Sequence, residues 1–308
     1  MDVVYVLGNG SRWKNNEIRF SLRSIEKNLT GVGNVFIVGV KPDFLQNVIH
    51  IEADDIFEPG INADGNIITK VLAACNDERL SDDFLFINDD HLVLKPTPIW
   101  TVEALHKGNM ERYEEDYWKL NYWRTRLKRT METLVERGLP AYHFDCHTPI
   151  IFNKEKFKEV MAGFDYQSDI GLTMKSLYGN SVYNTNKIRV KLSDQKKTIF
   201  KNYKLDEIEQ RLKRCRFMSF NDDGLNKALI RWLAKTFPTK SGYEKTEMED
   251  RVVEIIAWLN SERDYREGVA LFKKYMNGRN LIALFEGNET PGLRKKLEYK
   301  LTHVFDEI

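Results

Sequence analysis

The chain has 308 residues, 42% hydrophobic and 30% charged, the composition of a globular protein with a large core. Its 47 basic and 46 acidic residues give a net charge of +1, so no overall field favours nucleic acid or an anionic membrane. No run of about 18 apolar residues occurs, and the start of the chain lacks the basic residues of a signal peptide. We therefore expect no transmembrane segment and a cytoplasmic protein, or one peripheral to the inner face of the membrane.

The first hundred residues alternate between strand-like and helix-like segments. Continuous apolar runs predict strands at residues 3–7, 35–38, 48–51 and 84–87. Helical spacing predicts a helix capped by Asn15 or Asn16, which ends at Gly31, and another helix over 66–75. This β-α-β-β-α-β order predicts an α/β fold, a mostly parallel sheet flanked by helices.

The most informative segment is the buried strand Phe84–Ile87, which is followed by Asn88, Asp89, Asp90 and His91. Ligands of open α/β sheets bind beyond the carboxyl ends of the strands. Adjacent carboxylates repel each other and are tolerated best beside a cation, and Mg²⁺ or Mn²⁺ at such a site suits a diphosphate. We predict a metal site at Asp89 and Asp90 for a nucleotide sugar; the alternative is a solvated turn at the end of the strand.

Residues 101–140 change character and predict a helical insertion. Met110 to Arg137 is rich in charge and in interleaved aromatic residues, which indicates one long helix or a helical pair with a basic face at 124–129. A solvated face with aromatic packing beneath it is the simpler interpretation. The alternative is a lid or an acceptor platform, because aromatic rings stack on sugars and arginine pairs with phosphate.

Two later segments carry candidate polar residues. Residues 141–152 are strand-like, and alternation would place His143, Asp145 and His147 on one face as a metal ligand, general base or phosphate donor, although His143 could be structural. Phe217–Phe220 followed by Asn221, Asp222 and Asp223 repeats the earlier pattern before a helix over 225–237. Asn221 or Asp222 could be only the cap of that helix.

Four segments together resemble the Stealth family of hexose-1-phosphate transferases, which includes bacterial capsular polysaccharide phosphotransferases and the catalytic part of the animal N-acetylglucosamine-1-phosphotransferase. Residues 2–6 look like the first block of the family, and 16–27, 35–38 and 84–90 look like the second. His147-Thr148-Pro149 with Lys154 resembles the third, and 219–223 with 237–244 resembles the fourth. The first block departs from the family, because Leu7–Arg12 stands where a tryptophan and an acidic pair are usual.

The resemblance implies a glycosyltransferase-A-like fold over residues 1–244 and a Mg²⁺- or Mn²⁺-dependent reaction in bacterial capsule polysaccharide synthesis. An acceptor hydroxyl, on a glycan or similar molecule, would attack the sugar-linked phosphorus of a nucleotide diphosphate sugar and release a nucleoside monophosphate. It implies that His147, Asp90 and Asp145 are catalytic. Contacts with the donor and its phosphates would come from five residues: Asp2, Asn16, Arg19, Arg23 and Asp222.

Several alternatives fit the same residues. Arg19 and Arg23 lie one helical turn apart and can bind phosphate together, or form surface salt bridges with Glu17 or Glu26. The enzyme could instead transfer the sugar itself and release a nucleoside diphosphate. A non-enzymatic sugar- or nucleic-acid-binding protein is a further alternative, supported by basic stretches at 124–129 and 211–216.

Two expectations concern the rest of the chain. Residues 245–308 predict a helical tail that packs on the domain or mediates a homo-oligomer. The three cysteines lack paired or metal-type spacing, which predicts reduced thiols.

Overall fold

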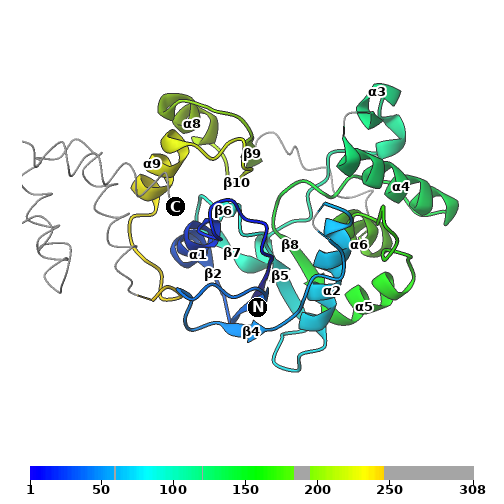
Figure 1. The fold of residues 1–308 in the computed structure, drawn as a ribbon, viewed down its shortest axis with the longest axis horizontal. Coiled ribbons are helices and arrows are strands. Elements are labelled where there is room, and N and C mark those ends of the chain that lie inside the picture. The colour runs from blue at the N-terminus through cyan, green and yellow to red at the C-terminus, as the bar shows by residue number, and fades with distance from the viewer. Residues whose placement is uncertain (59, 120, 184–194, 246–308) are drawn as a thin grey trace, which may run out of the picture.

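The computed structural model describes residues 1–58, 60–119, 121–183 and 195–245, and its strands there form one large sheet and two small ones (Figure 1). The large sheet has the order β4 (Ile49–Ile51), β3 (Val35–Gly39), β1 (Asp2–Leu7), β5 (Asp83–Phe86) and β8 (Ile150–Asn153). The first four strands are parallel, and β8 pairs antiparallel with β5. The predicted α/β class, a mostly parallel sheet flanked by helices, is confirmed.

Different helices cover the two faces of the large sheet. They are α1 (Glu17–Asn28), α2 (Ala63–Cys75), α5 (Lys154–Ala162) and α6 (Met174–Val182). Val4 packs into the core shared with α2, α5 and α6, whereas its neighbours Val3 and Tyr5 pack into the core shared with α1. In Figure 1, α1 lies to the left of the sheet, and α2 and α5 lie to the right. Burial of both faces explains why the strands are continuous apolar runs.

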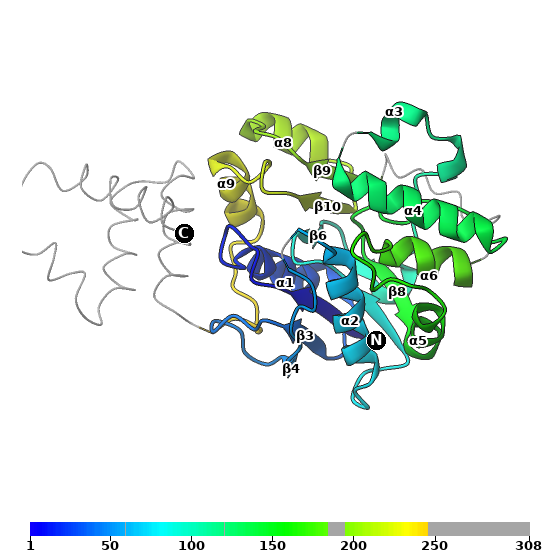
Figure 2. The same cartoon turned by 45° about the vertical axis from the view of Figure 1, so that its right-hand side comes forward.

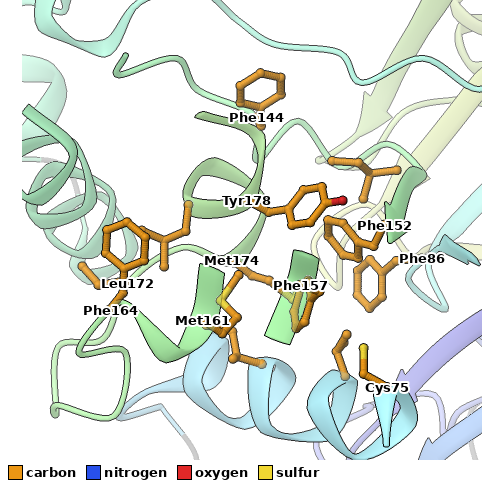
Figure 3. Packing of buried hydrophobic residues seen from close by; sticks show 14 of the residues in the cluster. Cys75, Phe86, Phe144, Phe152, Phe157, Met161, Phe164, Leu172, Met174 and Tyr178 are labelled. Atoms are coloured by element: carbon orange, nitrogen blue, oxygen red, sulfur yellow. The ribbon is translucent and has the colours of Figure 1, made fainter. Parts of the chain in front are cut away.

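Aromatic rings make up much of the core beneath α5 and α6. Phe152 of β8 lies 5.7 Å from Phe86, 4.9 Å from Phe157 and 4.6 Å from Tyr178, measured between ring centroids. Figure 3 shows these side chains gathered between the strand and the two helices. This packing fixes the end of β5, from which the chain continues to the predicted acidic site.

A smaller unit adjoins the large sheet (Figure 2). Its sheet has the order β6 (His91–Val93), β10 (Phe217–Phe220) and β9 (Lys196–Ile199), covered by α8 (Leu205–Leu212) and α9 (Lys227–Thr236). A third pair joins β2 (Leu29–Thr30) to β7 (Thr97–Pro98). The cap of α9 is Asn226, which accepts from Ala228 N and Leu229 N, so the predicted cap at Asn221 or Asp222 was wrong.

The insertion is built from short helices and one longer one. They are η1 (Ile99–Thr101), η2 (Met110–Arg112), α3 (Glu115–Trp118) and α4 (Tyr122–Glu136). Tyr113, Tyr117 and Trp118 pack on one another, and the Arg124 guanidinium lies 4.0 Å from the centre of the Tyr117 ring. Aromatic packing therefore accounts for these three rings, as the simpler interpretation had it.

The segment 141–149 is the clearest departure from the sequence-based expectation. Within it, Tyr142 forms an isolated bridge with Asn109, and the regular strand β8 begins only at Ile150. His147 has a positive φ of 52°, a conformation that breaks strand alternation. The prediction that His143, Asp145 and His147 share one strand face was therefore wrong.

The order of strands creates a switch point beside β1. The chain passes from β1 to β3 and β4 on one side and then returns to β5 on the other. Loops at the carboxyl ends of β1 and β5 consequently diverge and leave a crevice between them.

Three further expectations concern the C-terminal tail, the cysteines and membrane-spanning helices. The tail at 246–308 lies outside the described residues. Cys75, Cys146 and Cys215 are buried and free of disulfides. Among the described helices, none combines the length and apolar character needed to cross a membrane.

Candidate functional site

A cleft of about 570 Å³ occupies the switch point at the carboxyl edge of the large sheet. It is lined by the loop after β1 at 8–11, the segment 88–90 after β5 and the loop 220–222 after β10. Helices contribute Glu17 from α1 and Lys70 from α2. The strand Phe84–Phe86 thus delivers Asp89 and Asp90 to a cleft, as the sequence predicted.

Three carboxyl groups crowd one part of this cleft. Burial raises the pKa of Asp89, and repulsion from Asp90 and Glu17 raises it further. Burial also raises the pKa of Asp90, although the Lys175 and Lys196 ammoniums oppose this rise. Glu17 is 6% exposed, accepts from Ser11 Oγ at 2.8 Å, and has a pKa raised chiefly by burial. Such crowding favours either protons or a cation at these carboxyls.

Asp90 lies beside two imidazoles. One potential ligand atom from each of Asp90, His91 and His147 falls within 4.8 Å of the others. His91 Nε2 is 3.5 Å from Asp90 Oδ1, and the two imidazole rings are 6.0 Å apart. His91 is fully buried, and among the described residues neither of its ring nitrogens has a hydrogen-bond partner.

These residues fit a divalent metal ion. A buried imidazole without partners is unfavourable unless something ligates it, and burial lowers the pKa of His91, which keeps the ring neutral. A mixed set of one carboxylate and two imidazoles suits Mn²⁺ or another transition ion better than Mg²⁺. The predicted pair of ligands was Asp89 and Asp90, but the three-residue group contains Asp90 without Asp89.

Two buried lysines hold the loop that carries His147. Lys196 Nζ donates to the carbonyl of Cys146 at 2.9 Å, and Lys175 Nζ donates to the carbonyl of Thr148 at 2.8 Å. Both lysines are 6% exposed. These bonds hold the residues immediately before and after His147. They thereby stabilise the left-handed backbone conformation of His147.

The lysines also determine the electrostatics around His147. His147 is exposed as a whole residue, but desolvation of its ring and the ammoniums of Lys196 and Lys175 lower the pKa of the imidazole to about 3. Burial, and next the repulsion from Lys107, lowers the pKa of Lys196 to about 7. A general base works best with a pKa near the working pH, so this environment suits His147 to ligation more than to proton abstraction.

A second cavity, of about 190 Å³, adjoins the cleft. The two share the lining residues Ala63, Ile67 and Asn88. Asp145 and His147 both line the second cavity. The Asp145 carboxylate accepts from Ser176 Oγ at 2.5 Å and from Ser176 N at 3.2 Å, which fixes its direction.

His143 lies apart from these groups. It is fully buried, its Nδ1 is bonded to the Tyr113 hydroxyl at 3.0 Å, and Trp123 packs 5.8 Å away. His143 is therefore a packed residue of the insertion, whereas Asp145 and His147 reach the cavity together despite the irregular backbone.

Two of the predicted donor contacts are engaged elsewhere. Asp2 stands at the amino end of β1, the edge opposite the cleft, where it accepts from Asn34 N at 2.7 Å and Ser81 N at 2.8 Å. Asn16 Oδ1 accepts from Arg19 Nε at 2.7 Å, and its neighbour Asn15 lines the cleft. The prediction of a donor contact at Asp2 was wrong, because strand direction places it at the wrong edge.

Arg19 and Arg23 are also engaged within the fold. Both contact the buried carboxylate of Glu244, Arg23 through two bonds of 2.9 Å and Arg19 at 3.4 Å. Their predicted role in phosphate binding was wrong, and so was the alternative pairing with Glu17 or Glu26, because a residue more than 220 positions away supplies the partner.

Asp222 does line the cleft, at its rim. Its carboxylate is 46% exposed and lies 3.3 Å from Arg12 Nε, whose side chain is 76% exposed. This contact joins the loop after β1 to the loop after β10 across the cleft.

The basic stretches are largely used in intramolecular contacts. In the first, Arg126 is buried against Asp64, Lys128 pairs with Glu115, and Arg129 pairs with Asp165. In the second, Arg211 stacks 4.5 Å from the Tyr203 ring, and Arg216 bonds to Thr97 and Thr101. These partners remove much of the support for a nucleic-acid-binding protein.

Sequence reasoning did not identify Glu17, Lys175 or Lys196 as parts of the site. Lys175 is the second residue of α6 and Lys196 is the first of β9, in segments without a polar motif. Glu17 opens α1 and was considered only as a salt-bridge partner. A charged residue inside an apolar pattern is the available signal, and only tertiary packing shows which of these become buried.

No family model matches the chain, and no curated protein matches it. Among solved structures, the galactosyltransferase LgtC in complex with donor and acceptor sugar analogs is similar with a TM-score of 0.44 and 11% identity, covering 79% of this chain and 98% of that one. The apo-form glycosyltransferase GlyE of Streptococcus pneumoniae TIGR4 has a TM-score of 0.23 and 10% identity, covering 89% of each chain.

Proposed function

We propose that the chain is a metal-dependent transferase that uses a nucleotide diphosphate sugar and moves its sugar-1-phosphate to a hydroxyl of a glycan-like acceptor. The observation that carries this proposal is the Asp90–His91–His147 group beside the buried ammoniums of Lys175 and Lys196. A metal site at the switch point of a parallel sheet, with lysine side chains close by, suits a diphosphate.

The donor would lie in the larger cleft with its diphosphate at the acidic group. Asp90, His91 and His147 would hold Mn²⁺ or Mg²⁺, and the ion, when bound, supplies charge neutralisation of the diphosphate and of the leaving phosphate. Lys175 and Lys196 hold the loop that carries His147, and their charges act on Asp90. Positive charge close to the metal ligands favours an anionic donor.

The finer assignment, transfer of sugar-1-phosphate, draws on the resemblance to the Stealth family and on this arrangement of cations. In that reaction a bond forms between the acceptor oxygen and the sugar-linked phosphorus. The bond from this phosphorus to the oxygen of the departing nucleoside monophosphate breaks. The acceptor proton passes to Asp145, whose carboxylate is oriented by Ser176 and lines the second cavity.

Identification of the released nucleotide tests the proposal. The full chain is incubated with Mn²⁺ and a panel of nucleotide sugars, and the products are separated by anion-exchange chromatography. We expect a nucleoside monophosphate in proportion to donor consumed. A nucleoside diphosphate in that proportion would instead identify a glycosyltransferase, and no cleavage of any donor would contradict both enzymatic assignments.

A thermal-shift measurement supports the choice of donor for this assay. Nucleotide sugars that bind the folded chain raise its Tm by mass action, and the rise should depend on Mn²⁺. A donor that stabilises the chain equally in chelator would speak against a metal-dependent diphosphate site.

A further inference from the structure

The second cavity adjoins the cleft in which the proposed donor would lie. It contacts the larger cleft through Ala63, Ile67 and Asn88, and His147 forms part of its wall. A molecule inside it would therefore reach His147, whereas a donor in the larger cleft would reach Asp90 of the same three-residue group. Its volume of about 190 Å³, against about 570 Å³ for the cleft, limits the occupant to a small group.

The chemistry of its walls is that of a site for a sugar ring. Trp123, from the first turn of α4, is half-buried and is held against His143 at 5.8 Å between ring centroids. The carboxylates of Asp64 and Asp145 line the cavity beside Trp123. An indole offers a flat apolar surface to the C–H groups of a pyranose, and carboxylates accept hydrogen bonds from its hydroxyls.

The formal charge of the walls favours an uncharged occupant. Asp64 and Asp145 are balanced by Arg126 and Lys175. Arg126 is saturated by its own partners, with bonds of 2.8 Å to Asp64, 2.6 Å to the carbonyl of Ile170 and 2.7 Å to that of Ile61. Lys175 donates to the carbonyl of Thr148. An anionic ring would bring a carboxylate close to two existing carboxylates without a new cation.

Asn88, at the boundary between the two cavities, has an oxygen without a hydrogen-bond donor among the described residues. This atom, Oδ1, is buried. Asn88 lines both cavities, and a rotation of its side chain would bring this oxygen to a hydroxyl placed between them.

We infer that the second cavity is the acceptor subsite and that it binds the terminal pyranose of an uncharged glycan. The inference rests on the proposed function for its role in catalysis. Trp123 stacks on the ring, Asp64 binds a hydroxyl, and Asn88 and Asp145 contact the hydroxyl that attacks. Donor phosphates remain in the larger cleft.

Saturation-transfer NMR with the full chain and no donor tests the subsite directly. The probes are the methyl glycosides of glucose, galactose, mannose and N-acetylglucosamine, with the methyl glycoside of glucuronic acid as the charged counterpart. We expect at least one uncharged probe to receive saturation and the charged probe to bind more weakly. Trp123→Ala should raise the Kd of that probe about tenfold or more, because a large aromatic contact is lost.

Matched variants distinguish loss of the stacking ring at the subsite from the loss of any tryptophan. Trp100→Ala removes another tryptophan, 67% exposed and outside both cavities, and Trp123→Phe retains a ring, so both should keep the probe bound. If Trp123→Ala does not fold, Ile67→Phe, which narrows the cavity, should weaken the probe instead.

Three results would overturn the inference: no saturation of any uncharged probe, equal binding after Trp123→Ala, or equal binding of the glucuronide. Hydrolysis of donor by water, measured without acceptor, should be unchanged in Trp100→Ala, which lies outside both cavities. Failure of donor cleavage in the wild-type chain would defeat the proposed function, whereas the glycoside titration decides the subsite independently.

Discussion

Two segments of this chain end alike in sequence and differ in the structure. Phe84–Asp90 and Phe217–Asp223 are both apolar runs followed by Asn-Asp-Asp. The first forms β5, in the parallel sheet beside β1, and the second forms β10, in the small sheet between β6 and β9. Both reach the same cleft, but Asp90 lies beside two imidazoles, whereas Asp222 is half-exposed and pairs with Arg12.

The local pattern therefore determines only that acidic residues follow a strand. What surrounds them depends on the neighbouring strands and on segments distant in the chain. Asp90 meets His147 from the loop before β8, and the charges of Lys175 and Lys196 from α6 and β9 act on it. Asp222 lies on the rim, where solvent screens its charge. Substitutions at equivalent positions should separate the two segments by their effect on turnover.

The largest effect is expected from Asp90→Asn. The variant loses a metal ligand and a charge at the diphosphate. A bound metal stabilises the transition state by several kcal/mol, so its loss should lower turnover by roughly 10³-fold. Folding should survive, because Asn keeps the size of the side chain and removes a carboxyl whose ionisation is disfavoured by burial. Nucleotide release at saturating Mn²⁺ is the measurement.

Asp223→Asn is the matched control, since Asp223 holds the same place after β10 and is exposed. We expect its turnover to stay within about twofold of wild type, as for surface substitutions away from a site. Equal losses in the two variants would show that the segments are equivalent, and full activity of Asp90→Asn in chelator would eliminate the metal site.

The next largest effect is expected from His147→Asn. If His147 is a metal ligand, its loss should raise the Mn²⁺ concentration needed for half-maximal rate. Loss of a residue that only hydrogen-bonds to a metal ligand typically costs roughly 10- to 100-fold in affinity, so we expect at least that rise here. Asp145→Asn should instead lower kcat by roughly 10² to 10⁴ without changing the metal requirement. An unchanged metal requirement in His147→Asn, with loss of the fall of kcat at acidic pH, would make His147 the base.

Part of this site was visible in the sequence. The strand at Phe84 to Phe86, its position in a parallel sheet and the delivery of Asp90 to a ligand crevice follow from apolar patterning and from the geometry of α/β sheets. His147 was identified as well, but from strand alternation that the segment does not have. Its positive φ is stabilised by Lys175 and Lys196, and no local pattern encodes bonds from such distant residues.

Charged residues within helical patterns were the main source of error. Arg19 and Arg23 share a helix face, which is equally consistent with phosphate binding and with burial against a carboxylate. The partner, Glu244, lies more than 200 residues away, so spacing within α1 cannot reveal it. Long-range pairing of this kind requires the tertiary structure.

A smaller effect, with a distinct pH signature, is expected from Lys196→Met. Loss of its bond to the Cys146 carbonyl should loosen the His147 loop, and a charged hydrogen bond is worth about 1.5–3 kcal/mol, or roughly 10- to 100-fold in turnover. Burial lowers the pKa of Lys196 to about 7. The ordinary lysine pKa, which applies to the unfolded chain, is close to about 10. Between pH 7 and about 10 the Lys196 side chain therefore binds more protons in the unfolded than in the folded chain. The free energy of unfolding consequently rises with pH over this window.

Chemical denaturation from pH 7 to 10 measures this contribution. The free energy of unfolding of wild type relative to Lys196→Met should rise with pH over this window, since Met removes the titrating group. Lys197→Met is the control. Lys197 is the next residue of β9, and the bond to the Cys146 carbonyl comes from Lys196. A pH-independent difference would contradict a buried Lys196 ammonium.

The smallest effect is expected from Asp222→Asn. Its contact with Arg12 is an ion pair between two exposed side chains, and such pairs contribute about 0–1 kcal/mol because water screens them. The loops that it joins keep their own bonds, including Gly224 N to Asn221 Oδ1 at 3.0 Å. We therefore expect the donor KM to rise by less than about threefold, with an unchanged kcat and a smaller difference from wild type at high salt. Arg12→Gln should match it, and a loss in Asp222→Asn as large as that of Asp90→Asn would place the second acidic segment in the chemistry of the site.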